Sequence, residues 1–206
     1  LCPSKILIAC LVLQCCTISA LAAGTKHSDT RQHLSSASPH WLRAVGKLHI
    51  PTIKYEAGRR KNHIEDCSAT LVTIGTLKKA DTIITAWHCL EHYRDLSKAI
   101  VFTLMPNQNE QVQRQAYRLA DGGSMTADWA ILRLDRPITG TGIYPLKLNP
   151  TRADPQILIT MAGYSKDKGK GKEGKSLSYD ADCQILAQRA NDSHSNCIAH
   201  KGASGG

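Results

Sequence analysis

Three short segments, far apart in the chain, each place a residue with reactive chemistry next to an apolar run. The segment TAWHC contains His88, the segment ADWAILRL contains Asp128, and the segment GASGG contains Ser204. A serine hydroxyl is a poor nucleophile until a base removes its proton and nearby donors stabilise the resulting oxyanion. The order His88, Asp128, Ser204 therefore predicts that folding brings a base and a carboxylate to Ser204.

The three segments resemble the T-A-x-H-C, D-x-A-x-L-x-L and G-x-S-G-G motifs of the chymotrypsin-like, double β-barrel serine peptidases. The chain order of the three residues distinguishes this family from the subtilisin and α/β-hydrolase arrangements of the same groups. The resemblance covers about residues 44–206. It implies an all-β fold, with a first β-barrel at residues 44–140 and the start of a second at residues 141–206. We expect the second barrel to be truncated, because too few residues remain to close it, and the chain as given to be inactive.

The resemblance also implies a role for each residue. His88 takes the proton of Ser204 as general base and returns it to the leaving amine as general acid. Asp128, buried beside the imidazole, fixes the tautomer and stabilises the imidazolium. The N–H groups of Gly202 and Ser204 form the oxyanion hole. The implied function is a secreted serine endopeptidase that cleaves protein or peptide substrates through an acyl-enzyme, without a cofactor or a metal.

Several alternatives remain open at this level. Asp121 and Asp135 compete with Asp128 as the carboxylate, although neither begins the apolar run. Trp87 stands beside the histidine where the family has a small residue, and Ala69 stands where a glycine is common. The alternative function is a catalytically silent, secreted binding protein on the same scaffold, against which the intact set of three residues argues.

The residues around Arg43 resemble the activation junction of this family, where a basic residue precedes a new amino terminus. In trypsin-like zymogens that terminus pairs with an aspartate just before the nucleophile, but this chain has Ala203 there. We therefore expect the oxyanion loop, the segment that carries Gly202 and Ser204, to be ordered without that ion pair. Cleavage at Arg43 would then only trim the chain. The basic run at residues 59–61 is either a second processing site or an exposed basic turn after Gly58.

Substrate preference has only weak indicators. Ile198 occupies the position at which a trypsin-like pocket would hold aspartate, so a simple preference for arginine or lysine lacks its usual anion. His200 resembles a feature of the glutamyl-endopeptidase branch, whose members accept acidic side chains. A surface histidine is the other interpretation.

The first 23 residues are typical of a secretory signal peptide, with Lys5, an apolar run at 6–13 and small residues up to Ala23. An uncleaved anchor is disfavoured because the apolar span is short. A lipoprotein modified at Cys10 is the other alternative, although the apolar run continues beyond that cysteine. Residues 24–43 are polar and predict a linker or a short pro-segment. We expect a secreted or periplasmic protein.

Four of the eight cysteines lie in residues 1–23 and four remain, at positions 67, 89, 183 and 197. Four cysteines allow three connectivities. The family resemblance favours Cys67 with Cys89, which leaves Cys183 with Cys197. No C-x-x-C pair or close histidine and cysteine cluster is present among them, so we expect no zinc site.

The formal net charge is +9, but the lysines and arginines are spread along the chain and no stacking aromatic residues accompany them. This pattern favours a solvated surface over nucleic-acid binding. We also expect no stable membrane insertion and a monomer. β-branched and apolar runs predict strands at residues 69–74, 82–85, 100–104, 112–119, 128–134, 156–164, 177–186 and 197–200. The Lys- and Gly-rich residues 166–175 predict a mobile loop.

Overall fold

The computed structural model describes residues 28–206 except 75–78, 107, 141, 150 and 190–191. The predicted signal peptide lies outside the described residues. The described chain is mostly β-structure, with three short 3-10 helices. Within it there is no helix whose length and apolar character would let it cross a membrane.

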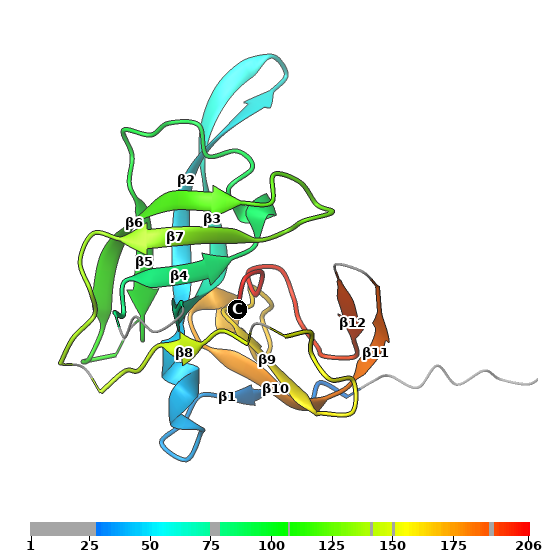
Figure 1. The fold of residues 1–206 in the computed structure, drawn as a ribbon. Coiled ribbons are helices and arrows are strands. Elements are labelled where there is room, and N and C mark those ends of the chain that lie inside the picture. The colour runs from blue at the N-terminus through cyan, green and yellow to red at the C-terminus, as the bar shows by residue number, and fades with distance from the viewer. Residues whose placement is uncertain (1–27, 75–78, 107, 141, 150, 190–191) are drawn as a thin grey trace, which may run out of the picture.

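The first half of the chain forms a closed, six-stranded antiparallel barrel (Figure 1). The strand order is β2-β5-β6-β7-β4-β3, and pairing of β2 with β3 closes the circle. A short strand, β8 (Leu146–Lys147), extends the sheet by pairing parallel to β3. The barrel strands are β2 (Val45–Glu56), β3 (Arg59–Thr73), β4 (Thr82–Thr85), β5 (Ile100–Leu104), β6 (Val112–Asp121) and β7 (Ala130–Leu134).

Alternating side chains fill this barrel. In β7, Ala130, Leu132 and Leu134 are buried while Arg133 is exposed, as the period of two in a strand requires. The core is otherwise mostly leucine, isoleucine and alanine, with two cysteines and a methionine, around Phe102, the chain's single phenylalanine, which is fully buried. The six-stranded barrel is therefore filled mainly by aliphatic side chains.

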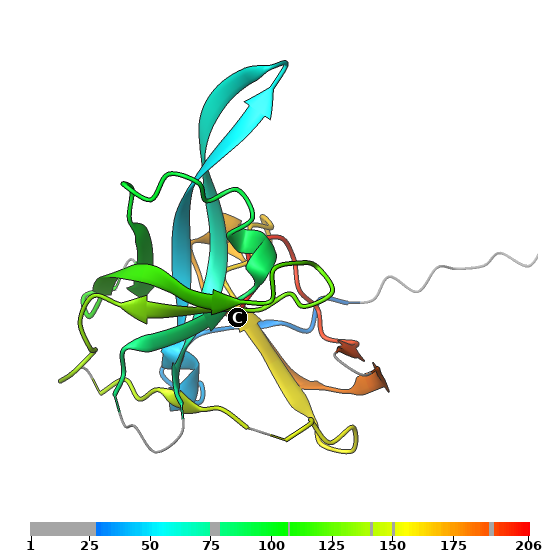
Figure 2. The same ribbon diagram turned by 45° about the horizontal axis from the view of Figure 1, so that its top comes forward.

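The β2–β3 hairpin is longer than the barrel and projects from it (Figures 1 and 2). Its two turn residues, Ala57 and Gly58, both have positive φ, 48° and 76°, as in the tight turns that match the twist of antiparallel strands. The basic residues 59–61 begin β3 next to this turn and are exposed. The hairpin tip therefore carries a solvent-exposed basic segment.

The second half forms two smaller antiparallel sheets. One has the order β1-β10-β9, from β1 (Gln32–His33), β10 (Ser178–Cys183) and β9 (Ile159–Gly163). The other is the hairpin of β11 (Ile185–Gln188) and β12 (Ser193–Ser195). Neither sheet closes into a barrel within the described residues. The predicted all-β class is thus confirmed, and one closed barrel followed by further strands fits the expected double-barrel fold.

Two strand predictions in this half differ from the structure. The run at 177–186 is two strands rather than one, since β10 ends at Cys183 and β11 begins at Ile185 with a different partner. Within β10 the register shifts around Asp182, which has a φ of 61°. Residues 197–200 form no strand, and the strand of this region, β12, lies earlier. Residues 166–175 form a loop that contains main-chain hydrogen bonds and the 3-10 helix η3 (Lys172–Gly174), and its mobility stays a prediction.

The segment before the barrel packs on the second half. Within residues 24–43, the described part is 28–43, and it supplies β1 and most of the 3-10 helix η1 (His40–Ala44). Arg31 and Leu42 are buried, with exposed fractions of 2% and 0%. Leu42 joins a second core cluster with Val45, Ala162, Tyr164, Leu177 and Tyr179. The described part of this polar segment is therefore built into the fold.

The end of the chain, at Gly206, lies between the two halves in both ribbon views (Figures 1 and 2). The main-chain N–H of Ser68, in β3, donates to the carbonyl oxygen of Ser204 at 2.9 Å. A barrel strand therefore positions the segment that carries the predicted nucleophile.

Candidate active site

Strand pairing brings two of the predicted residues together. β4 and β7 are antiparallel neighbours, with Thr85 opposite Ala130. His88 follows the end of β4 in the 3-10 helix η2 (Trp87–Cys89), and Asp128 precedes the start of β7. The sheet register therefore places the two residues at the same edge of the barrel.

Asp128 binds His88 at two points. One carboxylate oxygen, Oδ1, accepts the main-chain N–H of His88 at 2.8 Å. The other, Oδ2, lies 2.7 Å from the ring Nδ1 of His88. The Asp128 side chain is 27% exposed. It is therefore half-buried, whereas the sequence led us to expect a buried carboxylate. The paired contacts hold the ring with its Nδ1 edge toward the carboxylate, which leaves Nε2 for another partner.

Ser204 follows a tight turn. The N–H of Ala203 donates to the carbonyl oxygen of His200 at 3.0 Å, and Gly202, the third residue of this turn, has a φ of 96°. A side chain at Gly202 would lie 2.6 Å from the carbonyl oxygen of Tyr164. The positive φ and the close carbonyl together require glycine at this position.

The residue after the predicted nucleophile also requires glycine. Gly205 has a φ of 85°, and a Cβ there would lie 2.2 Å from Oγ1 of Thr85. The Gly-x-Ser-Gly-Gly segment therefore fits closely against the end of β4, which leads to His88.

The N–H groups of Gly202 and Ser204 have no hydrogen-bond acceptor among the residues that the structure describes. Their carbonyl groups, in contrast, are occupied: Ser68 donates its hydroxyl to Gly202 at 2.8 Å and its N–H to Ser204. Two neighbouring free N–H groups are the arrangement that stabilises a developing oxyanion.

A cavity of about 220 Å³ brings together two of the three predicted catalytic residues, His88 and Ser204. His88, Gly202 and Ser204 line it, together with the Cys67–Cys89 disulfide and polar side chains of β2 and β3. In the described structure no hydrogen bond joins His88 Nε2 to Ser204 Oγ. Such contacts are often long in a protein without substrate and shorten when the substrate binds.

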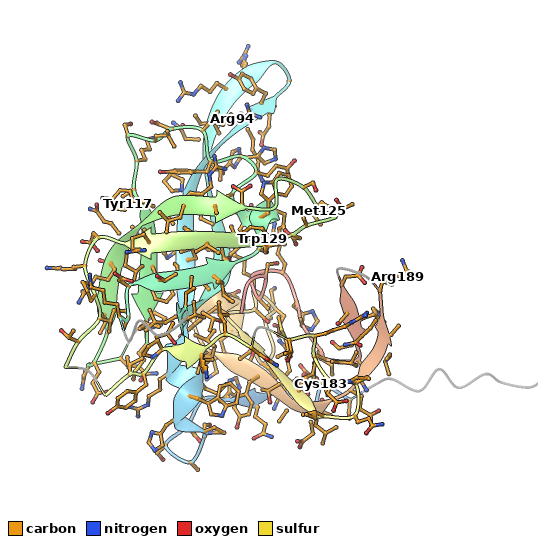
Figure 3. The ribbon with its side chains drawn as sticks, viewed as in Figure 1. Arg94, Tyr117, Met125, Trp129, Cys183 and Arg189 are labelled. Atoms are coloured by element: carbon orange, nitrogen blue, oxygen red, sulfur yellow. A yellow bond between two sulfur atoms is a disulfide. The ribbon has the colours of Figure 1, made fainter. Side chains whose placement is uncertain are left out.

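A second, larger hollow of about 820 Å³ lies beside Asp128, which does not line the first cavity. It is lined by residues 125–129 and by Asp192, which precedes β12. Met125 and Trp129 are exposed there, by 65% and 46%. Figure 3 shows both on the loop that leads into β7, on the same side of the molecule as Arg189 of the β11–β12 hairpin.

Two disulfides brace the site. Cys67 of β3 is bonded to Cys89, next to His88. Cys183 of β10 is bonded to Cys197, which begins the segment leading to Ser204. The expected connectivity is therefore present, and each bridge fixes a segment that carries one of the predicted catalytic residues.

Asp66 is the most perturbed acid of the cavity. Burial raises its pKa, but the hydrogen bond from His49 and the charges of Lys47 and Lys166 outweigh burial and lower the pKa to about 2. The lysine nitrogens lie 3.8 Å and 3.3 Å from the carboxylate. The acid is therefore ionised at neutral pH and compensated by cations.

Two groups have the spacing of metal ligands in the described chain, and neither is available to bind an ion. One includes Cys67 and Cys89, whose sulfurs are bonded to each other. The other is Asp29, Asp167 and His200, but the Arg31 guanidinium already pairs with both carboxylates, at 2.6 Å and 2.8 Å. A cation would compete with that arginine.

The remaining predicted residues lie outside the catalytic cavity. Asp121 pairs with Arg118 at 3.3 Å, and Asp135 accepts the N–H of Gln115 at 3.2 Å, so neither competing carboxylate contacts His88. The ring of His200 lies within 4.8 Å of the carboxylates of Asp29 and Asp167, and this residue does not line the cavity.

Sequence reasoning missed Ser68 and Arg31. Ser68 is fully buried between the two halves, and Arg31 is buried in a segment whose composition is polar. A serine after a cysteine and one arginine among many carry no recognisable motif, so only the fold reveals their contacts.

Known structures share this architecture. A thermostable serine protease, AL20, from an extremophilic microorganism aligns with a TM-score of 0.53 at 17% identity, covering 81% of this chain and 77% of that one. The protease Anisep from Arthrobacter nicotinovorans aligns with a TM-score of 0.52 at 18% identity, covering 78% and 70%. At these identities the similarity defines the class of fold, that of the chymotrypsin-like serine proteases.

The profile of the family described as Trypsin matches residues 58–206. The chain therefore belongs to the trypsin family. No curated protein sequence matches it significantly. Family and fold together support a serine protease, acting on proteins, and leave the glutamyl-endopeptidase branch without confirmation.

Proposed function

We propose that this protein is a secreted serine endopeptidase whose triad is His88, Asp128 and Ser204, with the N–H groups of Gly202 and Ser204 as the oxyanion hole. One observation carries the proposal. Asp128 holds the His88 ring by Nδ1 at 2.7 Å, and His88 lines the same cavity as Ser204 and Gly202, whose N–H groups are free.

In the proposed reaction, Ser204 Oγ attacks the carbonyl carbon of the substrate while His88 Nε2 accepts its proton. The carbonyl oxygen becomes negative and takes hydrogen bonds from Gly202 and Ser204. His88 then gives the proton to the leaving amine, which breaks the peptide bond and forms the acyl-enzyme. Water, deprotonated by His88, releases the acid and restores Ser204.

We propose that the substrate lies across the two hollows, one lined by His88 and Ser204 and the other by Asp128. The cavity beside Ser204 is polar, with Lys54, Glu65 and Asp66 in its wall. The larger hollow carries the exposed side chains of Met125 and Trp129. An extended peptide with apolar residues on one side of the scissile bond and polar residues on the other side fits these surfaces.

Secretion is part of the proposal. Both pairs of cysteines in the described chain are bonded, which is typical of an oxidising compartment. Export through the predicted signal peptide would deliver the chain there, as a monomer.

The test is exposure of the full gene product, in its folded and oxidised form, to a fluorophosphonate probe, followed by mass spectrometry of the labelled peptide. We expect labelling at Ser204 that is lost in the His88→Ala variant. A folded wild-type protein without labelling would instead support the catalytically silent binding protein, and the search would turn to its binding partners.

A further inference from the structure

Arg31 is almost completely enclosed, with 2% of its side chain exposed. Its guanidinium pairs with Asp29 at 2.6 Å and, through two nitrogens, with Asp167 at 2.8 Å and 3.0 Å. The hydrogen bonds from Arg31 lower the pKa of Asp167 well below its usual range, so the pair stays ionised. Burying a charge is costly unless it is paired. The Arg31–Asp167 ion pair therefore favours the one arrangement in which the N-terminal segment lies beside Asp167.

The residue beside Asp167 contacts the oxyanion loop directly. The N–H of Lys166 donates to the carbonyl oxygen of Lys201 at 2.6 Å. Lys201 and Gly202 share one peptide unit, and a trans peptide points its C=O and N–H in opposite directions. Fixing the carbonyl of Lys201 therefore fixes the direction of the Gly202 N–H, one of the two proposed oxyanion donors.

A second connection runs from the same N-terminal segment. The hydroxyl of Thr30 donates to Asp180 Oδ1 at 2.8 Å. The other oxygen of Asp180 accepts the N–H of Ile198 at 2.7 Å, just after the Cys183–Cys197 disulfide. Residues 30 and 31 thus reach the oxyanion loop at its beginning, through Ile198, and at its turn, through Lys201.

These contacts hold the oxyanion loop in a chain that lacks the family's ion pair next to the nucleophile. A carboxylate before the nucleophile, which the resemblance leads one to expect, is replaced by Ala203, and that residue is 3% exposed. No ionic partner can therefore hold the loop from within. We propose that Arg31 is a positioning residue for the oxyanion hole, acting through Asp167 and Lys166 on the Lys201–Gly202 peptide. This inference rests on the proposed function.

The proposal makes residues 29–33 a part of the catalytic unit. A buried ion pair with a merely structural role would lower stability and leave the chemistry of folded molecules unchanged. A positioning role lowers the rate of the chemical step at unchanged substrate binding, because the oxyanion forms only in the transition state.

The experiment compares Arg31→Met and Arg31→Lys with the wild-type full gene product. Methionine removes the charge, and lysine keeps it without the planar fork that binds two carboxylates. Arg133→Met is the matched control, because Arg133 pairs with Asp81 at 3.3 Å on the first barrel, remote from the oxyanion loop. Each protein is examined by hydrogen exchange and by steady-state kinetics on a peptide substrate.

In Arg31→Met we expect faster exchange in peptides covering residues 164–175 and 197–206, with the first barrel unchanged. We expect kcat to fall by about 10- to 100-fold, below the loss for deleting an oxyanion donor, with KM within about 2-fold. Arg31→Lys should lie between Arg31→Met and the wild type. Unchanged exchange in residues 197–206, or an equal fall of kcat in Arg133→Met, would overturn the proposal.

If Arg31→Met does not fold, Thr30→Val gives the same comparison through the Asp180 connection, and unchanged exchange at residues 197–206 there counts against the proposal. The exchange readout does not depend on catalysis. A wild-type protein that fails to react with a fluorophosphonate but shows the exchange change in Arg31→Met would contradict the proposed function and still support the positioning of the loop by Arg31.

Discussion

The hydroxyl of Ser68 donates to the carbonyl oxygen of Gly202 at 2.8 Å and accepts the main-chain N–H of Tyr164 at 2.8 Å. Ser68 belongs to β3 of the first barrel, whereas its two partners belong to the second half. One fully buried hydroxyl therefore joins the barrel to the loop that carries the proposed oxyanion donors.

We expect Ser68→Ala to lower the free energy of unfolding by about 1–3 kcal/mol, because two buried main-chain groups lose their partner. It should also lower kcat, since the Gly202 peptide gains freedom. Urea denaturation and kinetics measure the two effects. Ser38→Ala is the control: Ser38 is buried against Tyr179, so its loss should affect stability and spare kcat. An unchanged kcat in Ser68→Ala would contradict this account.

Asp128→Asn keeps an acceptor for the His88 N–H but no longer carries the charge that holds the ring tautomer. We expect kcat/KM on a peptide substrate to fall by about 10⁴-fold, with a small change in stability. Asp121→Asn is the matched control, because Asp121 pairs with Arg118 and should leave the activity unchanged. Equal losses in the two variants would show that the carboxylate was assigned wrongly.

Much of the first barrel was predictable from the sequence. The runs at 82–85 and 100–104 are β4 and β5, because a short strand with apolar residues facing a core has a clear local pattern. The hairpin of β2 and β3 was not predicted over its whole length. Its outer part is polar and extends beyond the barrel, so no buried face marks it in the sequence.

The site divides in the same way. His88, Asp128 and Ser204 lie in motifs, so a resemblance could identify them. Arg31 could not be identified, because its role depends on a contact with Asp167, 136 residues later in the chain. Only the packing of the folded protein brings these two residues together. Local patterns report local structure, and a long-range ion pair leaves no local pattern.

The pH dependence of the free energy of unfolding should reveal how much the ionised Asp66 carboxylate stabilises the folded protein. Its pKa of about 2 in the folded protein is below the ordinary 3.8, so folding favours the ionised form. The stabilisation is therefore fully present above about pH 4 and is lost as the pH falls toward 2. Since the lysines are partly solvated, we expect about 1 kcal/mol.

The measurement is the free energy of unfolding of the wild type and Asp66→Asn, from urea denaturation between about pH 2.5, close to the lowered pKa, and about pH 6, well above the ordinary pKa. The wild type should be more stable at pH 6, and the difference should shrink in acid. Lys47→Met, made in both backgrounds, should reduce the difference at pH 6. A difference that grows as the pH falls would have the wrong sign.

Arg43 lies where a protease has little access. Its neighbours Leu42 and Ala44 are both 0% exposed, and β2 begins at the next residue, with Val45 opposite Thr70. Cleavage after Arg43 therefore requires local unfolding. Residues 59–61, next to the hairpin tip, are basic and exposed.

Limited digestion with trypsin should therefore cut within residues 59–61 before it cuts after Arg43, as measured by intact mass. Replacing Arg59, Arg60 and Lys61 by glutamine should remove the early cut, and Arg43→Gln should not. Arg43→Gln should also keep the kcat/KM of the wild type, because the oxyanion loop is held by Arg31 and needs no new amino terminus. The contradicting result is a wild-type protein whose activity rises many-fold when the bond after Arg43 is cleaved, together with an Arg43→Gln variant that stays inactive.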